Sequence, residues 1–433
     1  MRPFSTVARS LAHCLRGRIP GQLVIQLTDH CNACCPQCGM RTTVGFPRSR
    51  LSTEVVRKII DAAAEKGIQA LSFTGGEVML RQKELTDLIC YAGEAGIPFL
   101  RTGTNGFFLT GSQEAGFESR IERIAEKLAA TPLRNFWISL DSAVPAIHEA
   151  MRGFPGVVSG IERAIPIFHR HGIYPSVNLG INRNITEETR SLPPCGIEEN
   201  PQEYSEYFYE LYQNGFRAFY RFVIDLGFTI VNSCYPMSIE EETVTHQLNA
   251  VYAASSGDTV ISYSNFEKAL LFRALSDTLP EFRSRIRIFS PQTSLYALGR
   301  QYADQTTFPA PCRGGVDFFF INARDGMTYP CGYRGNENLG DFSKLNIGAI
   351  TAKDGCRKCE WECFRDPSEL FSPLLQARSA PVALLKKLGN NPEYRRLWLK
   401  DLSYYRACNF FDGRKPLNSK RLQKISTPHN LQQ

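Results

Sequence analysis

Four of the fourteen cysteines in this 433-residue chain lie within eight residues, in the segment CNACCPQC. Thiolates at such short spacing suit metal chelation better than internal disulfides. The segment offers three ligands in two registers: Cys31, Cys35 and Cys38, or Cys31, Cys34 and Cys38. One zinc ion bound by all four is disfavoured, because the side chains of adjacent residues point apart in extended or turn backbone. Three thiolates on a four-iron cluster leave one iron open to a small chelating ligand.

A second group of cysteines lies between residues 312 and 363, and the other five are scattered along the chain. Its members are Cys312, Cys331, Cys356, Cys359 and Cys363. The tight C-x2-C spacing predicts a metalloprotein in a reducing compartment, so we expect a cytoplasmic protein. The N-terminus shows no secretory signal, and no window approaches the roughly 18 apolar residues of a membrane span.

The elements that must position these cysteines alternate between strand and helix over about 235 residues. Apolar runs predict strands over 22–28, 68–74, a third ending near Thr102, 135–141, 174–181 and 228–232. Helical spacing predicts helices over 52–66, 83–95, 118–129, 159–171, 202–224 and 239–253. Residues 255–310 give no clear pattern, and an Asp325-Gly326 turn predicts a hairpin. The fold class is therefore α/β: a partial (β/α)6 TIM-like barrel, with a smaller cysteine-rich region and a helical tail.

Polar and glycine-rich segments follow the ends of successive predicted strands. The cysteine loop follows the first, GGE the second, TNG the third and SLD the fourth, and Cys234 lies just past the sixth. Chemistry in such folds gathers at the C-terminal ends of the strands. One rim of the barrel therefore carries all of these segments.

In this order, Cys31-x3-Cys35-x2-Cys38 and GGE resemble the radical S-adenosylmethionine (SAM) superfamily. The resemblance implies that these three cysteines hold a [4Fe–4S] cluster, that Cys34 is not a ligand, and that the open iron binds SAM. Reductive cleavage of SAM then gives a 5′-deoxyadenosyl radical, which abstracts hydrogen from the substrate. The resemblance also implies a low-potential electron donor such as flavodoxin or ferredoxin.

The same resemblance implies residues that contact SAM. Gly75, Gly76 and Glu77 resemble the loop that meets the methionine amino group, where glycine allows a close backbone approach. The further implied contacts are Thr104, Asn105, Ser139, Asp141, Arg152 and Asn178. Two positions depart from the family pattern: Val78 stands where proline is usual, and Gln37 where an aromatic residue is usual.

The second cysteine group resembles a shortened SPASM or twitch domain. Cys312-x13-Gly326-x4-Cys331 matches the first half of that pattern, and Cys356-x2-Cys359 matches the start of the second. The resemblance implies one auxiliary [4Fe–4S] cluster bound by these four cysteines. Cys363 could replace one of them or add a fifth ligand. A C-x2-C zinc ribbon from the same residues is the alternative.

We expect five regions and a radical SAM oxidoreductase or maturase. The regions are 1–19 (basic segment), 20–255 (radical SAM core), 256–310 (connection), 311–366 (auxiliary-cluster domain) and 367–433 (basic helical tail). The expected substrate is a peptide or natural product undergoing net oxidation or bond formation, with a small-molecule dehydrogenase as the alternative. Residues 368–433 hold 12 Lys/Arg against 4 Asp/Glu. A basic tail is also compatible with a different class of protein, a zinc protein that binds nucleic acid. A solvated helical surface is the commoner explanation of such a tail.

Overall fold

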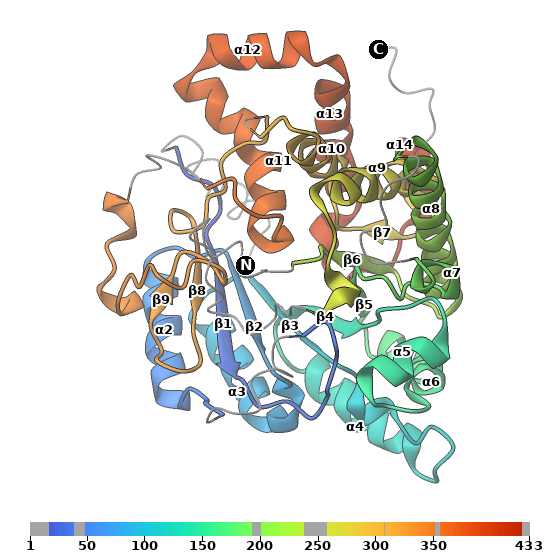
Figure 1. Ribbon diagram of the computed structural model, residues 1–433. Coiled ribbons are helices and arrows are strands. Elements are labelled where there is room, and N and C mark those ends of the chain that lie inside the picture. Colours follow the sequence, from blue (N-terminus) through green and yellow to red (C-terminus); the bar gives the residue numbers. More distant parts are fainter. Residues whose placement is uncertain are drawn as a thin grey trace.

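One nine-stranded sheet forms the centre of the described structure, with helices packed around it (Figure 1). The computed structural model describes residues 17–38, 48–192, 201–237, 258–306, 308–350 and 356–426. The strand order is β7-β6-β5-β4-β3-β2-β1-β8-β9. Neighbours from β7 to β8 are parallel, and β9 is antiparallel to β8. Because β7 and β9 lie at opposite edges of the described sheet, the barrel is open.

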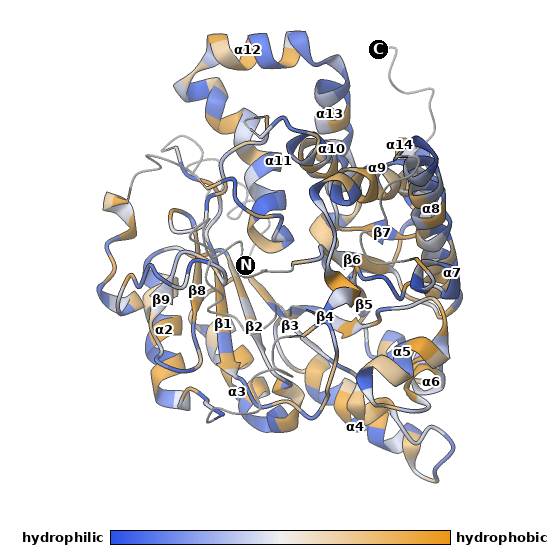
Figure 2. Cartoon of the chain, viewed as in Figure 1, coloured by the Kyte–Doolittle hydropathy of each residue, from blue (hydrophilic) through white to orange (hydrophobic). Residues whose placement is uncertain are grey.

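The strands are short and mostly buried. Their bounds are β1 (Gln22–Thr28), β2 (Ala70–Gly75), β3 (Phe99–Thr104), β4 (Leu133–Ser139), β5 (Ser176–Gly180), β6 (Ile230–Cys234), β7 (Arg287–Ile288), β8 (Phe318–Ile321) and β9 (Thr328–Tyr329). Apolar side chains run along β1 and β8 in particular (Figure 2). Burial on both faces is what a parallel sheet between helices requires.

Helices follow most of the strands and continue into the tail. The α-helices are α2 (Thr53–Glu65), α3 (Gln82–Glu94), α4 (Phe117–Ala129), α5 (Pro145–Arg152), α6 (Val157–Arg170), α7 (Glu187–Arg190), α8 (Pro201–Asp225), α9 (Asn265–Phe282), α10 (Gln292–Tyr302), α11 (Glu362–Ser379), α12 (Pro381–Asn390), α13 (Pro392–Ala407) and α14 (Ser419–Ser426). Short 3-10 turns are η1 (Val78–Arg81), η2 (Phe107–Leu109), η4 (Thr259–Ile261), η5 (Phe342–Lys344), η6 (Ile347–Ala349) and η7 (Asn409–Phe411). Within the described ranges, none of these helices is long and apolar enough to cross a membrane.

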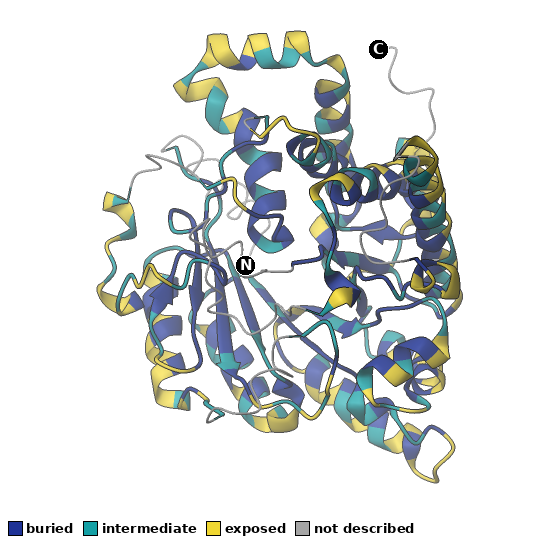
Figure 3. Ribbon diagram, in the orientation of Figure 1, coloured by how far each residue is buried: buried dark blue, intermediate teal, exposed yellow. Residues whose placement is uncertain are grey.

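The sequence of α2 shows how one of these helices forms. Ser52 caps α2, since its side chain accepts a hydrogen bond from the amide of Val55 (3.3 Å). Val56, Ile59 and Ile60 then lie on one face of the helix and are buried against the sheet. The outer faces of the surrounding helices remain exposed (Figure 3).

The structure confirms the predicted α/β class and the six predicted strands, with shifted ends. β3 runs on to Thr104, and β4 and β6 are displaced by two residues from the predicted 135–141 and 228–232. The predicted hairpin is confirmed by the antiparallel β8–β9 pair, with Gly326 at a φ of 68° in its turn. β7 and β8 extend the sheet beyond the predicted six units. The predicted helix 239–253 lies outside the described residues.

The cysteine-rich segment joins the barrel directly. β8 pairs in parallel with β1, from Gln22 opposite Phe318 to Ile25 opposite Ile321. A separate apolar cluster forms on this side, and it includes Val24, Phe320, Trp361 and the buried cysteines of the second group. The second cysteine group is therefore anchored to the edge of the sheet next to β1, the strand that leads into the first cysteine loop.

Part of the basic tail contacts the barrel at the end where β4 and β5 begin. The amide of Gly413 donates to the carbonyl of Arg134 (2.7 Å), and its own carbonyl accepts from the amide of Tyr174 (2.7 Å). The guanidinium of Arg414 donates to the carbonyls of Leu128 (2.9 Å), Ala129 (3.2 Å), Thr131 (2.7 Å) and Leu133 (2.7 Å). These carbonyls lie at the end of α4 and the start of β4, where α4 leaves backbone acceptors unsatisfied.

Arg414→Ala should lower the free energy of unfolding by about 2–3 kcal/mol, because several buried carbonyls lose a charged donor. Chemical denaturation of the anaerobically purified protein measures this. The adjacent exposed Lys415→Ala is the control and should change stability by less than ~0.5 kcal/mol. Equal effects of the two substitutions would contradict a structural role for Arg414.

Candidate functional site

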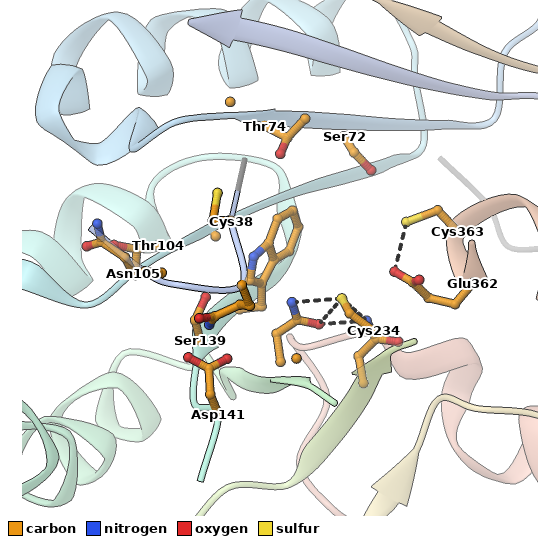
Figure 4. A pocket seen from close by; sticks show the side chains of 18 of the residues that line it. Cys38, Ser72, Thr74, Thr104, Asn105, Ser139, Asp141, Cys234, Glu362 and Cys363 are labelled. Carbon is orange, nitrogen blue, oxygen red and sulfur yellow. Dashed lines mark hydrogen bonds between the residues drawn. The ribbon is translucent and has the colours of Figure 1, made fainter. Parts of the chain in front are cut away.

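A cavity of about 300 Å³ lies inside the barrel, at the C-terminal ends of the strands. Its wall combines side chains of β1 to β6 with the first cysteine loop, β8 and the start of α11 (Figure 4). This size is within the usual range for ligand-binding pockets. The predicted rim and the observed cavity therefore coincide.

The cysteine loop after β1 sends three of its four thiols to this cavity. Cys31, Cys35 and Cys38 line it, whereas Cys34 is exposed and does not. Burial raises the pKa of the Cys31 and Cys35 thiols. Of the two registers open to the sequence, the structure thus brings together Cys31, Cys35 and Cys38.

The donor set at this loop suits an iron–sulfur cluster. Cys31, Cys35 and Cys38 place three thiols on one wall of the cavity, and thiolates are the usual ligands of a four-iron cluster. Asn105 Nδ2 lies 3.8 Å from Cys31 Sγ, which supplies the kind of hydrogen bond that tunes such sulfurs.

The Gly75-Gly76-Glu77 loop is held against the start of the cysteine loop by its backbone. The amide of Gly76 donates to the carbonyl of Thr28 (2.7 Å), and the amide of Glu77 donates to the carbonyl of His30 (2.8 Å). A Cβ on Gly75 would lie 2.2 Å from Thr28 O, and one on Gly76 would lie 2.0 Å from His30 O. Only glycine permits this approach.

Glu77 is buried and its carboxylate accepts three hydrogen bonds. Oε1 accepts from the amide of Met79 (3.0 Å) and from Thr104 Oγ1 (3.0 Å), and Oε2 accepts from the amide of Asn105 (2.6 Å). Burial nevertheless raises the pKa of Glu77 to about 7. A cationic amino group in the cavity would favour the ionised carboxylate. Thr104 and Asn105, expected as direct SAM contacts, line the cavity and also orient Glu77.

Asp141 and Arg152 form a bidentate ion pair at the same rim. Arg152 Nε and Nη2 donate to the two Asp141 oxygens at 2.7 and 3.0 Å. Burial alone would raise the pKa of Asp141, but Arg152 and His148 outweigh it and hold the pKa below its ordinary value. Burial lowers the pKa of His148 to about 4, so its ring is neutral at physiological pH. The pair fixes the Arg152 guanidinium beside the cavity.

Ser139 and Asn178 also line the cavity and face each other across β4 and β5. Asn178 is part of a side-chain network: its Nδ2 lies 3.2 Å from Cys234 Sγ, and its Oδ1 accepts from Asn232 Nδ2 (2.7 Å). Figure 4 shows these hydrogen bonds at Cys234. Neither sequence spacing nor the resemblance indicated this network.

The opposite wall contains Glu362 and Cys363 from the start of α11 (Figure 4). Cys363 Sγ donates to Glu362 Oε1 (3.4 Å). Burial raises the pKa of Glu362 and raises that of Cys363 well above its ordinary value. Cys363 was expected near the auxiliary cluster, but the structure directs it into this cavity, away from the other cysteines of its group. Cys359 lies in the loop before α11, whereas Cys363 is the second residue of that helix, so the two side chains lie in different surroundings.

The other four cysteines of the second group line a separate small cavity: Cys312, Cys331, Cys356 and Cys359. Three of the sulfurs accept a backbone amide from the residue two positions later, namely Gly314, Tyr333 and Lys358, each at 3.4 Å. Burial raises the pKa of Cys359 well above its ordinary value, and a backbone hydrogen bond from Trp361 opposes that rise. Such amide-to-sulfur contacts are typical of thiolate clusters. Trp361 lines both cavities.

Comparison with known proteins relates this site to one family model. A model described as "Radical SAM superfamily" matches residues 25–190. The chain is 27% identical over 174 residues to an AdoMet-dependent heme synthase from Methanosarcina barkeri, covering 40% of this chain and 46% of that protein. It is 24% identical over 326 residues to another from Oleidesulfovibrio alaskensis, covering 71% and 68%. A PqqA peptide cyclase from Xanthomonas campestris pv. campestris is 25% identical over 179 residues, covering 41% and 44%. The match thus spans about half the length of the first and third relatives.

Solved structures show only a loose likeness. SuiB from Streptococcus suis bound to S-adenosylmethionine aligns with a TM-score of 0.49 and 14% identity, over 79% of this chain and 69% of that chain. Native anSMEcpe with bound AdoMet and a Cp18Cys peptide aligns with a TM-score of 0.49 and 15% identity, over 88% and 99%. TM-scores below 0.5 do not support a functional comparison.

Arg152→Met should lower the free energy of unfolding by about 3 kcal/mol, because buried Asp141 loses its counterion. Since the pKa of Asp141 is held below that of an unfolded aspartate, this contribution is present above about pH 4 and is lost as the pH falls. Denaturant titrations at pH 7 and at about pH 3 measure both effects.

The double variant Asp141→Asn/Arg152→Met should regain much of the loss, because no buried charge remains. Arg170→Met is the matched control, since Arg170 forms an exposed ion pair with Glu122 and should cost less than ~1 kcal/mol. A double variant as unstable as Arg152→Met would show that the cost does not come from unpaired charge.

Proposed function

We propose that the chain is a radical SAM enzyme, the superfamily whose model matches residues 25–190, and that it cleaves SAM reductively to modify a peptide or natural product. Cys31, Cys35 and Cys38 would hold a [4Fe–4S] cluster, which with SAM bound would supply the radical chemistry that removes a hydrogen atom from the substrate. The observation that carries the proposal is the junction of two loops. Cys31, Cys35 and Cys38 lie on one loop, and Glu77 is hydrogen-bonded through its backbone to that loop.

The remaining polar groups of the rim suit the other parts of SAM. Glu77 presents a carboxylate to the amino group, and Arg152, fixed by Asp141, presents a cation to the methionine carboxylate. Ser139, Asn178 and Asn105 supply hydroxyl and carboxamide groups for the ribose. Gly75 and Gly76 keep this part of the wall free of side chains.

A second [4Fe–4S] cluster would be held by Cys312, Cys331, Cys356 and Cys359, four buried or half-buried thiols around one cavity. Cys363 is outside this set. The amide hydrogen bonds to the sulfurs fit a thiolate cluster. Trp361 forms the wall between this site and the larger cavity.

Net oxidation of a substrate requires one proton and one electron to leave after hydrogen abstraction. Glu362 faces the larger cavity, is buried, and has a raised pKa, so it is suited to hold that proton. The second cluster is suited to take the electron, because Trp361 lines both cavities. This arrangement supports an oxidative maturase.

Relatives point to two substrate classes. One is named a PqqA peptide cyclase and others are named AdoMet-dependent heme synthases. We place a peptide first and a small-molecule oxidoreductase second. A low-potential flavodoxin or ferredoxin in the cytoplasm would reduce the first cluster.

A zinc protein that binds nucleic acid is the rival of another class. Its basis was the basic tail, yet Arg414 in that tail satisfies backbone carbonyls of α4 and β4. Iron content separates the two proposals. The radical SAM proposal requires about eight irons per chain and broad absorption near 400 nm, whereas a zinc protein is colourless.

Cys35→Ala should lose about four irons and all formation of 5′-deoxyadenosine from SAM and a strong reductant, because it removes a cluster ligand. Cys34→Ala is the matched control and should retain both, since Cys34 is exposed and outside the cavity. Iron analysis and chromatography of the nucleoside measure these outcomes. Loss in Cys34→Ala with retention in Cys35→Ala would reverse the assigned register.

Cys331→Ala should lose about four irons while still forming 5′-deoxyadenosine, because it disrupts only the second cluster. Cys363→Ser should keep about eight irons, because Cys363 lies in the other cavity. Iron analysis of the two variants side by side tests the ligand set. Equal iron loss in both would make Cys363 a ligand.

A further inference from the structure

Arg101 lies inside the barrel, on the wall that the SAM contacts do not use. It is on β3 and lines the cavity, three residues before Thr104 and therefore about 10 Å along the strand from it. Its neighbours in the sheet are Ser72 on β2 and Asn135 on β4. Both side chains also line the cavity.

Arg101 forms no ion pair with a carboxylate of the described residues, although its charge acts on the Cys363 thiol and opposes the rise of that thiol's pKa by burial. Its Nε is buried without a hydrogen-bond partner. Its guanidinium lies against two aromatic rings instead, 5.8 Å from the centre of Trp137 and 5.4 Å from the centre of Phe289. Arg101 is half-buried, so its guanidinium loses part of its hydration without gaining a counterion, and aromatic faces compensate only part of that cost.

The other charged groups of the cavity are already engaged. Arg152 is paired with Asp141, and Glu77 accepts three hydrogen bonds from its own surroundings. Glu362 accepts a hydrogen bond from Cys363, and within the described ranges the structure records no ion pair between Glu362 and Arg101. The substrate part of the cavity therefore has one positive charge available.

The neighbours of Arg101 add a second donor. Ser176 Oγ donates to Asn135 Oδ1 (3.1 Å), which leaves the Asn135 amide nitrogen for another acceptor. The Trp137 ring packs directly on Gly103, because a Cβ on Gly103 would lie 2.1 Å from Trp137 Nε1. A planar guanidinium beside a carboxamide N–H is suited to a carboxylate.

We propose that Arg101, together with Asn135, binds a carboxylate of the substrate inside the barrel. The inference rests on the proposed function, because it takes this cavity as the substrate site. One guanidinium matches one negative charge, so the substrate is a carboxylic acid, either a small free acid or a peptide with a terminal carboxylate. Arg101 thereby selects substrates by charge and positions them below SAM.

The first test is anion binding, which needs no turnover. Trifluoroacetate is titrated into the anaerobic holoprotein and followed by ¹⁹F NMR, with neutral trifluoroacetamide as the matched probe. Wild type should bind trifluoroacetate at least tenfold more tightly than Arg101→Met, with Arg101→Lys between them. Trifluoroacetamide should not distinguish the variants. Equal binding of trifluoroacetate to wild type and Arg101→Met overturns the proposal.

The second test is stability without ligand. If Arg101 is unpaired until substrate binds, Arg101→Met should raise the melting temperature of the ligand-free protein by about 2 °C, since an uncompensated charge is removed. An arginine kept for structure predicts the opposite, so a lowered melting temperature also overturns the proposal. Neither test uses SAM cleavage, and so failure here is distinct from a failure to form 5′-deoxyadenosine.

Competition identifies the source of the carboxylate. Acetate, N-acetyl-pentaalanine with a free C-terminus and the same peptide as its C-terminal amide are each added to bound trifluoroacetate. Displacement by acetate and by the peptide acid, but not by the amide, indicates a peptide terminus. Displacement by acetate alone indicates a small free acid. Displacement by the amide as strongly as by the acid contradicts recognition of charge.

Discussion

The close backbone contact between two loops is the constraint on which the site depends. Gly76 and Glu77 donate their amides to carbonyls of the segment from Thr28 to His30, at 2.7 and 2.8 Å. The loop after β2 is thereby fixed to the residues that lead into Cys31. A side chain at Gly75 or Gly76 would separate them. Because the parallel pairing of β1 and β2 brings the two loops to the same rim, the sheet and the glycines act together.

Around that contact, the cavity has a charged rim and a more neutral opposite wall. Glu77, Asp141 and Arg152 lie at the rim, and each is held by hydrogen bonds or an ion pair. The opposite wall holds Glu362 and Cys363, whose raised pKa values keep both groups neutral more readily than in water. This wall therefore carries little charge near neutral pH. Arg101, by contrast, brings a positive charge without an ion-pair partner into the cavity. In our proposal this charge selects substrates that carry a carboxylate.

Much of the fold followed from the sequence. Apolar runs and glycine punctuation predicted six strands, and the strong signal of the cysteine and GGE segments predicted which rim they share. Strand ends were less accurate, because register depends on pairing with neighbours that local sequence does not contain. β7 is two residues long and gave no pattern of its own. β8 was predicted as a strand of the hairpin, but nothing local in the sequence indicated that it pairs with β1 and so extends the barrel.

Only part of the candidate site was predicted from the sequence. Spacing identified the cysteines, yet it could not separate Cys363 from Cys359, since that depends on where α11 begins. Arg101 and Glu362 were not singled out, although the alternation along β3 places Arg101 on the same face as Gly103 and so into the barrel. Charged residues facing inward on predicted barrel strands are the signal that could have revealed Arg101.

Electron paramagnetic resonance of the anaerobically reduced protein, recorded before and after addition of SAM, tests the central claim most directly. If Cys31, Cys35 and Cys38 leave one iron open beside Glu77, the reduced protein gives a [4Fe–4S] signal that changes when SAM binds that iron. A protein that contains zinc and gives no such signal would contradict the account. So would a cluster signal that SAM leaves unchanged.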